Sequence, residues 1–199
     1  ASRYASSTMA ALFAPRHRAR LWRRIWIALA TAQRALGLPI TAAQIAALRQ
    51  HADTIDLTAV AVIERDVRHD VMAHVLAYGR QAPQAAGIIH LGATSCDVTD
   101  NADLMIYRDA LGLITDRVVD VLRAIAAFAR RERSRACLGY THLQPAQLTT
   151  VGKRACLWLQ DFQLDFAQLQ HVHANLRFRG LKGATGTQAS YLELFNGDH

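Results

Sequence analysis

Apolar residues that repeat every seven positions constrain this chain more than any other feature. The first segment fills both seam positions of a helical heptad, with one row at Leu104, Leu111, Val118 and Ile125 and another at Tyr107, Ile114, Val121 and Phe128. A helix over about residues 100–133 would be roughly 50 Å long, too long to be buried in a compact domain without helical neighbours of similar length. A later segment repeats the pattern at Leu148, Ala155, Phe162, Leu169 and Leu176, reinforced by Leu159 and Phe166. We therefore predict two long helices that pack in a bundle, with copies of themselves from other subunits.

The rest of the chain also favours helix. Hydrophobic residues make up 51% of the 199 residues, much of this alanine, with only 4 Pro and 11 Gly. The periodicity predicts an amphipathic helix over 16–36, a short helix from a Thr41–Gln44 capping box to about His51, and a helix over 70–78 ended by Gly79 and Pro83. Residues 57–67 are ambiguous because they contain many β-branched residues. The predicted fold class is all-α.

Targeting and cysteine patterns favour a soluble, cytoplasmic protein. The longest apolar runs are short and interrupted by charge, and the first residues lack the basic, apolar and cleavage regions of a signal peptide. The three cysteines, Cys96, Cys137 and Cys156, form no CxxC pair and have no histidine spacing suited to zinc. We expect reduced thiols and no membrane partner.

A net charge of +7 attracts anions, including phosphate esters, carboxylates and nucleic acid. The arginines cluster at residues 16–24 and 130–135, at or near the ends of helical patterns. Aromatic residues are only 7%, and the chain has no DNA- or RNA-binding motif. Solvated helix faces are therefore favoured over a nucleic-acid partner.

His142 lies in a polar stretch between the two long helical patterns. Thr141 and Gln144 flank it, Pro145 prevents an upstream helix from continuing, and Thr149 and Thr150 are candidate caps for the next helix. A histidine held in such a turn can transfer a proton near neutral pH. A hydrogen-bonded structural histidine is the alternative reading.

Other polar stretches offer groups for anions. Arg3 and Tyr4 can share phosphate oxygens, and Arg68, His69 and Asp70 adjoin at a helix start, where Asp70 could instead serve only as a cap. Two small-residue loops remain. In the loop over residues 90–101, Gly92 permits close approach of a ligand, and Thr94 and Ser95 offer hydroxyls, although the loop could simply cap a helix. The loop over residues 179–190 is rich in Gly and Thr but fits no nucleotide motif.

Five blocks together resemble the adenylosuccinate lyase family, particularly its animal-type form. They are SRYAS, RHDVMAHV, AAGIIHLGATSC followed by DN, GYTHLQPAQLTTVGKR and RFRGLKGATGTQAS, in the family's order and approximate spacing. The resemblance covers essentially the whole chain. It implies the fumarase and aspartase superfamily, whose homotetramers share a bundle of long central helices, with active sites shared between subunits. It also implies an N-terminal helical domain over 1–94 and the first part of the central bundle domain over 95–199.

The implied activity is elimination of fumarate from adenylosuccinate, giving AMP, and from succinyl-aminoimidazole carboxamide ribotide in purine biosynthesis. The resemblance implies no metal or organic cofactor. It assigns His142 as the general acid to the departing nitrogen and His69 as a second catalytic residue. The implied substrate-binding residues are Arg3 and Tyr4 on the phosphate, Thr94 and Ser95 on the succinyl part, and Arg68, His69, Asp70 and Thr141 elsewhere around the substrate.

The chain departs from the family at Asp97 and Thr99, where an aromatic residue and a glycine are usual, and we expect an altered turn before the first long helix. The family's serine-rich signature loop, which carries the base and a lysine, lies beyond residue 199. We therefore expect an N-terminal part of the enzyme that is inactive alone. The alternatives are a non-catalytic helical oligomerisation scaffold from the same family and a lyase acting on another succinyl adduct.

Overall fold

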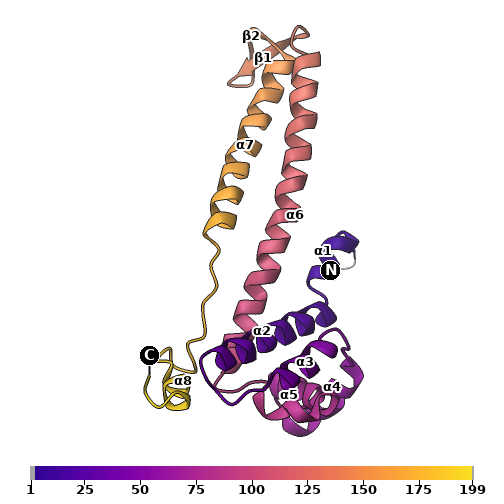
Figure 1. Ribbon diagram of the computed structural model, residues 1–199. Coiled ribbons are helices and arrows are strands. Elements are labelled where there is room, and N and C mark those ends of the chain that lie inside the picture. Colours follow the sequence, from indigo (N-terminus) through magenta and orange to yellow (C-terminus); the bar gives the residue numbers. More distant parts are fainter. Residues whose placement is uncertain (1–2, 199) are drawn as a thin grey trace. The chain divides into compact units, whose positions relative to one another are not determined.

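The computed structural model describes residues 3–198, which form two compact units (Figure 1). The first combines the residues up to Tyr107 with those from Arg177 onward, and the second is Arg108–Leu176. The domain division at residues 94 and 95 stays a prediction, because compactness within one chain is a different criterion from a family's domain division.

Helices make up most of both units, which confirms the all-α fold class. The first unit contains α1 (Ser7–Leu12), α2 (Pro15–Ala35), α3 (Ala42–Gln50), α4 (Leu57–Val67), α5 (Asp70–Gln81), the 3-10 helix η1 (Pro83–Ile88) and α8 (Ala189–Leu194). Helix α6 (Ser95–Arg131) begins in the first unit and continues in the second, where β1 (Ala136–Thr141), β2 (Gln144–Thr150) and α7 (Val151–Asn175) follow. Among the helices of residues 3–198, none combines the length and apolar character needed to cross a membrane.

Local capping explains several helix boundaries in the first unit. Pro15 opens α2, and Gly37, with φ of +96°, follows its end. The predicted capping box of α3 is confirmed, since Thr41 accepts from the Gln44 amide while the Gln44 side chain accepts from the Thr41 amide. The ambiguous residues 57–67 form α4, whose N-terminus is capped by the Asp56 side chain.

The predicted end of α5 at Tyr78 was wrong, since the helix continues to Gln81. Gly79 is buried inside it rather than ending it. A Cβ at Gly79 would lie 3.1 Å from the Cβ of Ala86 in η1. The glycine therefore permits close packing of η1 on α5, which a local rule for helix ends cannot anticipate.

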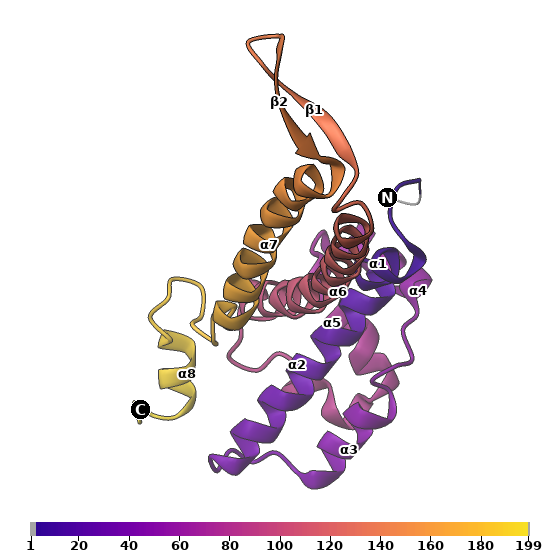
Figure 2. The same cartoon turned by 90° about the horizontal axis from the view of Figure 1, so that it is seen from above.

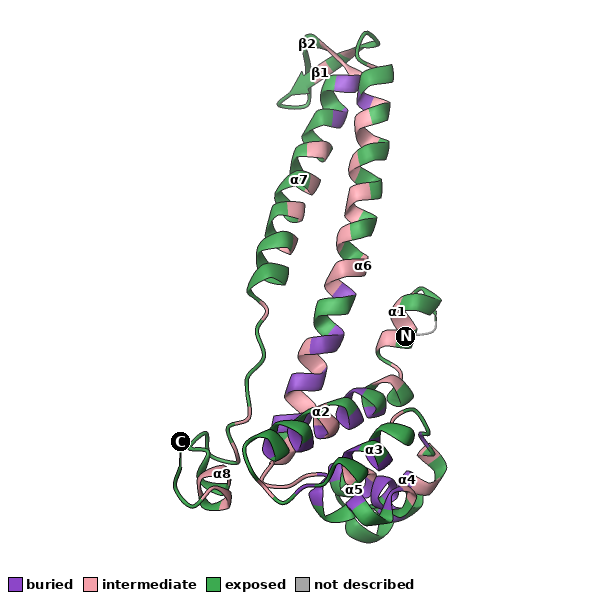
Figure 3. Ribbon diagram, in the orientation of Figure 1, coloured by how far each residue is buried: buried purple, intermediate pink, exposed green. Residues whose placement is uncertain are grey.

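The core of the first unit lies among α2, α3, α5, η1 and the start of α6, where buried residues are concentrated (Figure 3). Its largest fully buried side chains include Trp26, Tyr78, Leu48, Ile89 and Ile106. Arg23 is also buried, with 1% of its surface exposed. Its guanidinium donates to the carbonyl oxygens of His51 and Thr54 and to Gln81 Oε1, and it lies 4.1 Å from the Tyr78 ring centroid. Burial raises the pKa of Tyr78 to about 12, so its hydroxyl stays protonated and donates to the Leu48 carbonyl.

The two predicted long helices are confirmed, with shifted boundaries. Helix α6 begins at Ser95 rather than near residue 100, and α7 begins only at Val151, which leaves Leu148 on a strand. In the second unit the two helices run antiparallel, side by side (Figures 1 and 2). Apolar residues from both line a shallow groove, namely Leu111, Ile114, Val118, Phe162, Leu169 and Val172.

The segment between these helices is a β-hairpin, which the sequence analysis did not predict. Strands β1 and β2 pair antiparallel, with Thr141 opposite Gln144. His142 and Leu143 form its two-residue turn with φ of +51° and +60°, the left-handed values that a type I′ turn requires. The expectation that Thr150 caps the next helix is confirmed, because its side chain accepts from the Lys153 amide.

Candidate active site

The junction between α4 and α5 presents three of the predicted site residues together. Arg68 ends α4 in the left-handed region, with φ of +52°, an uncommon conformation for a non-glycine residue. His69 caps the N-terminus of α5, where its Nδ1 accepts a hydrogen bond from the Met72 amide at 3.3 Å. Acceptance at Nδ1 places the proton of the neutral ring on Nε2. The junction thus presents a guanidinium beside an imidazole whose orientation is fixed.

Asp70 does not cap α5, since His69 takes that role. Its carboxylate accepts from the Val71 amide at 2.7 Å and lies 3.5 Å from His69 Nδ1. Arg68, His69 and Asp70 are all exposed, so a bound molecule could reach them.

Ser95 joins this group from a different part of the sequence. It is the first residue of α6, and its Oγ lies 3.3 Å from His69 Nε2. The preceding Thr94 donates its amide hydrogen to Asp97 Oδ2 at 3.1 Å, which is one half of a capping box. The loop therefore does cap a helix, and it also brings a hydroxyl to the histidine. An imidazole N–H, a serine hydroxyl and a nearby guanidinium can together hold a carboxylate or phosphate.

His90 is a further polar residue at this loop that the sequence analysis did not single out as a site residue. Its Nδ1 accepts from the Trp26 indole N–H at 3.0 Å. Burial lowers its pKa, an effect that the charge of Asp97 opposes. A histidine directly after the apolar pair Ile88-Ile89 was the available signal, because a polar residue continuing a buried run needs a specific partner.

Arg3 and Tyr4 also belong to the first unit. The Arg3 guanidinium lies 5.3 Å from the Tyr4 ring centroid, and Tyr4 is strongly exposed. Both groups are free to meet a ligand, and their phosphate-binding role stays a prediction.

Thr141 and His142 belong to the second unit. Thr141 ends β1 and His142 is the first turn residue, and both are exposed. The hairpin and the first turns of α7 enclose an open hollow of about 890 Å³, which includes Thr141, Lys153 and Arg154 in its lining. A hydroxyl beside two cationic side chains is suited to an anion. The acid role of His142 stays a prediction.

Metal ligands do not gather in the described part of the chain. Across residues 3–198, no group of three or more His, Cys, Asp or Glu side chains is arranged to hold a metal ion. Cys96, Cys137 and Cys156 are free thiols in this structure.

The fold, with its two long helices, is that of the helical lyases of the fumarase and aspartase superfamily. The chain belongs to the lyase family, whose model, described as "Lyase", matches residues 6–192.

Named relatives narrow the comparison. The chain is 49% identical to adenylosuccinate lyase of Saccharomyces cerevisiae over 201 residues, which is 100% of this chain and 42% of the relative. It is 47% identical to that of Schistosoma mansoni, covering 99% of this chain and 41% of the relative. The chain thus spans about two fifths of the length of the curated relatives that it matches, and the resemblance to adenylosuccinate lyases is confirmed.

Solved structures agree in fold. The structure is similar to a fumarate lyase from Mesorhizobium sp. BNC1, with a TM-score of 0.85 and 31% identity, over 94% of this chain and 44% of that one. It is also similar to 3-carboxy-cis,cis-muconate lactonizing enzyme from Pseudomonas putida, with a TM-score of 0.85 and 26% identity, over 96% and 44% of the two chains. Each match covers less than half of the solved chain, as the sequence matches do for the curated relatives.

Proposed function

We propose that this chain forms part of an adenylosuccinate lyase. The enzyme eliminates fumarate from adenylosuccinate, giving AMP, and from succinyl-aminoimidazole carboxamide ribotide in purine biosynthesis. The observation that carries the proposal is the 3.3 Å contact between His69 Nε2 and Ser95 Oγ. It joins two separate sequence blocks that resemble substrate-binding segments of the family.

The chemistry of the substrate fits the residues. Adenylosuccinate carries a phosphate and two carboxylates, so cations and hydrogen-bond donors must dominate its site. Arg3 and Tyr4 hold the phosphate, Thr94 and Ser95 hold the succinyl part, and Arg68, His69, Asp70 and Thr141 complete the contacts. These roles are supported by the matched sequence blocks and by the accessibility of the groups, which are exposed except for the half-buried Thr94 and Ser95.

The reaction needs an acid and a base. A base removes a proton from the succinyl carbon, the carbon–nitrogen bond breaks, and the electron pair on the departing nitrogen takes a proton from His142. Such a positioned acid typically contributes ~10² to 10⁴ in rate. The base comes from outside these 199 residues, so the chain alone does not complete the elimination. The coverage of about two fifths of the relatives' length supports this.

The partner in this proposal is a second copy of the chain, in a homotetramer with sites shared between subunits. The support is apolar surface on the long helices, where Ile114, Leu157, Trp158 and Leu164 are exposed. Such a surface is typical of an interface. We also propose a cytoplasmic enzyme that needs no metal or organic cofactor and binds neither nucleic acid nor membrane.

A non-catalytic helical scaffold is the second candidate. The same exposed apolar helix faces favour it, because they support assembly without any chemistry. It predicts oligomers that have no affinity for the nucleotide.

Calorimetric binding of adenylosuccinate to the full-length protein, carrying His142→Ala throughout to suppress turnover, separates the two candidates. The matched variants are Arg68→Ala, at the α4–α5 junction, and Arg65→Ala, exposed in the last turn of α4. An enzyme binds the nucleotide, loses about tenfold or more in affinity with Arg68→Ala and changes little with Arg65→Ala, as expected for a charge-assisted contact. An assembled protein with no affinity for the nucleotide, or equal effects of the two variants, would overturn the proposal.

A further inference from the structure

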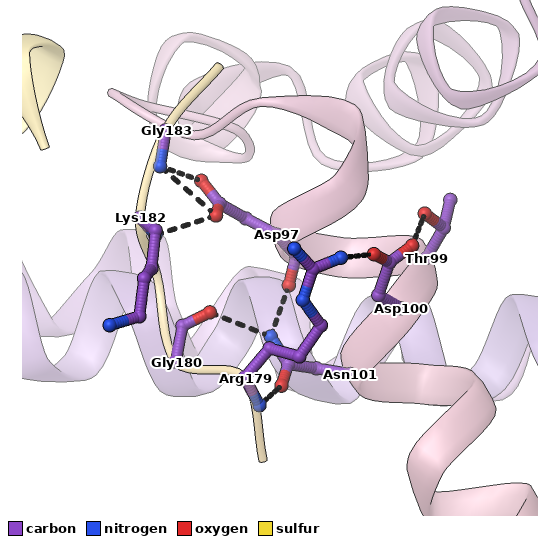
Figure 4. Close-up of polar contacts among 8 residues, drawn as sticks. All are labelled: Asp97, Thr99, Asp100, Asn101, Arg179, Gly180, Lys182 and Gly183. Carbon is purple, nitrogen blue, oxygen red and sulfur yellow. Dashed lines mark hydrogen bonds and ion pairs between the residues drawn. The ribbon is translucent and has the colours of Figure 1, made fainter. Parts of the chain in front are cut away.

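The Asp97 carboxylate is the centre of a buried polar network in the first unit. Only 4% of Asp97 is exposed, yet its hydrogen-bond donors are uncharged groups. Lys182 donates its amide hydrogen to Oδ1 at 2.8 Å, and the Gly183 amide lies 3.2 Å from each oxygen (Figure 4). Thr94 donates its amide hydrogen to Oδ2 at 3.1 Å, and the Tyr191 hydroxyl lies 3.4 Å from the same oxygen. A single carboxylate thus connects the start of α6 to the segment that begins at Lys182, which lies 85 positions later in the sequence.

Asn101, one turn further along α6, makes the same connection. Its Oδ1 accepts from the Arg179 amide at 2.9 Å, and its Nδ2 donates to the carbonyl oxygens of Gly180 and Asp97 (Figure 4). The neighbouring Asp100 forms an ion pair with the Arg179 guanidinium and accepts from Thr99 Oγ1. We call residues 179–191 the strap, because they are fastened along the first turns of α6.

The far end of the strap contacts the turn that leads into α6. Ser190 Oγ donates to the Gly92 carbonyl at 2.6 Å. Gly92 has φ of +73°, and a Cβ there would lie 3.1 Å from the Tyr191 ring. The Tyr191 ring therefore packs against Gly92 more closely than a residue with a side chain would allow. Burial raises the pKa of Tyr191, with the Asp97 charge adding to the effect, so its hydroxyl remains a donor.

Asp97 therefore holds the Thr94–Ser95 turn in two ways. It accepts directly from the Thr94 amide, and it binds the strap, whose Ser190 contacts Gly92 just before the turn. The Ser95 hydroxyl is the group from this turn that reaches His69. We infer that Asp97 is a positioning residue, which sets the Ser95 hydroxyl against the His69 imidazole by fastening the strap to the start of α6. The inference rests on the proposed function, in which Thr94 and Ser95 hold the succinyl part of the substrate.

The chemistry of the carboxylate is specific to this task. Its two oxygens accept from donors on both sides, whereas the amide of Asp97→Asn accepts through only one oxygen. In that variant an NH₂ group must face the Thr94 amide or the Lys182 and Gly183 amides. One connection is lost, although size and shape are almost unchanged.

The test introduces Asp97→Asn into the full-length protein, with Asp100→Asn as the matched control. Asp100 lies in the same helix turn and also contacts the strap, but through a more exposed ion pair. Tyr191→Phe is a milder variant that removes a single donor to the same carboxylate. Two readouts are used: amide hydrogen exchange of residues 91–96 and 179–191, and KM and kcat for adenylosuccinate, normalised to the folded enzyme.

We expect Asp97→Asn to speed exchange in both segments and to raise KM about tenfold with a smaller change in kcat, as when ground-state binding is lost. Tyr191→Phe should raise KM about two- to threefold, the effect of one weak hydrogen bond, and Asp100→Asn should change it less than twofold. If Asp97→Asn does not fold, the Tyr191→Phe result decides. The inference would be overturned if Asp97→Asn reduced only the amount of folded protein and left KM unchanged. Equal effects of the Asp97 and Asp100 variants on KM would also overturn it. Failure of the wild-type protein to cleave adenylosuccinate would instead overturn the proposed function, and the exchange readout would still report on the strap.

Discussion

His69 Nε2 lies 3.3 Å from Ser95 Oγ, although 26 positions separate the two residues in sequence. The other ring nitrogen of His69 accepts from the Met72 amide. Both nitrogens are therefore engaged, so the orientation of the ring is fixed before any ligand binds. Such pre-organisation lowers the ordering cost of binding.

Replacing Ser95 by alanine should weaken this arrangement. Loss of one hydrogen bond of this kind costs ~0.5–1.5 kcal/mol, so KM for adenylosuccinate should rise about two- to thirteenfold in the full-length protein. Steady-state kinetics measures the effect. Cys96→Ser, a change at the exposed neighbouring residue, is the control and should leave KM within twofold. Equal behaviour of the two variants would contradict a role for the Ser95 hydroxyl.

Acid should destabilise the first unit through two half-buried histidines. Burial lowers the pKa of His74, with the Arg23 charge adding to the effect, and burial lowers the pKa of His90 despite Asp97. Each folded pKa thus lies below the unfolded value of ~6.5, so the unfolded chain binds more protons as pH falls. The stability contribution is complete above that pH and is lost below it, at a slope of at most ~1.4 kcal/mol per pH unit for each histidine.

Urea unfolding of the 199-residue chain between pH 7.5 and 5 measures this slope. His90→Asn keeps an acceptor for the Trp26 indole N–H but cannot take up the proton, so it should reduce the slope. His171→Asn, at an exposed position of α7, should reduce it less. A slope unaffected by His90→Asn would show that other groups control acid stability.

Regular periodicity made the long helices predictable, whereas features that leave no regular pattern in the sequence were missed. The heptad rows predicted α6 and α7 because periodicity is a local property. The β-hairpin escaped prediction because its turn residues, His142 and Leu143, adopt left-handed angles without the usual Asn-Gly signal. Gly79 was interpreted as a helix end, although its small size serves contact with Ala86.

The candidate site follows the same division. Sequence blocks predicted Arg68, His69, Thr94 and Ser95, and the structure brings His69 and Ser95 into contact. The role of His69 as a cap was missed, since Asp70 is the commoner capping residue type. Asp97 was noted only as an unusual residue, because its partners in the strap lie about 85 positions away.

The contact between the end of α6 and the start of α7 should be sensitive to the addition of a single methyl group. A Cβ at Gly152 would lie 2.8 Å from the Arg133 backbone nitrogen and would clash with the Ala129 carbonyl oxygen. Gly152→Ala should therefore destabilise the chain by about 1–3 kcal/mol, the usual cost of overpacking. Gly112, in α6, is the matched control because a Cβ there meets nothing within 4 Å.

Gly112→Ala should stabilise the chain by ~0.5–1 kcal/mol, since alanine favours helix over glycine. Thermal and urea unfolding of the two variants measure the difference. Changes of the same sign in both variants would contradict the close packing at Gly152.

Removal of the buried Arg23 guanidinium should also be costly. Arg23→Met keeps an apolar stem but leaves the Thr54 carbonyl and Gln81 Oε1 without this donor. Loss of hydrogen bonds from a charged group, with buried acceptors left unpaired, should cost ~2–4 kcal/mol in the free energy of unfolding. Arg24→Met, at the exposed neighbouring position, should change it by less than ~0.5 kcal/mol. Similar urea midpoints for the two variants would argue against a structural role for Arg23.

The most direct test of the account is ultraviolet-monitored cleavage of adenylosuccinate, by the 199-residue chain alone and by the full-length protein, each with and without His142→Ala. We predict no turnover from the folded chain alone, turnover by the full-length protein, and a loss of ~10² to 10⁴ in its rate with His142→Ala. Robust turnover by the chain alone would contradict the claim that the base lies outside it. A full-length protein that folds and assembles but does not cleave adenylosuccinate would contradict the proposed function itself.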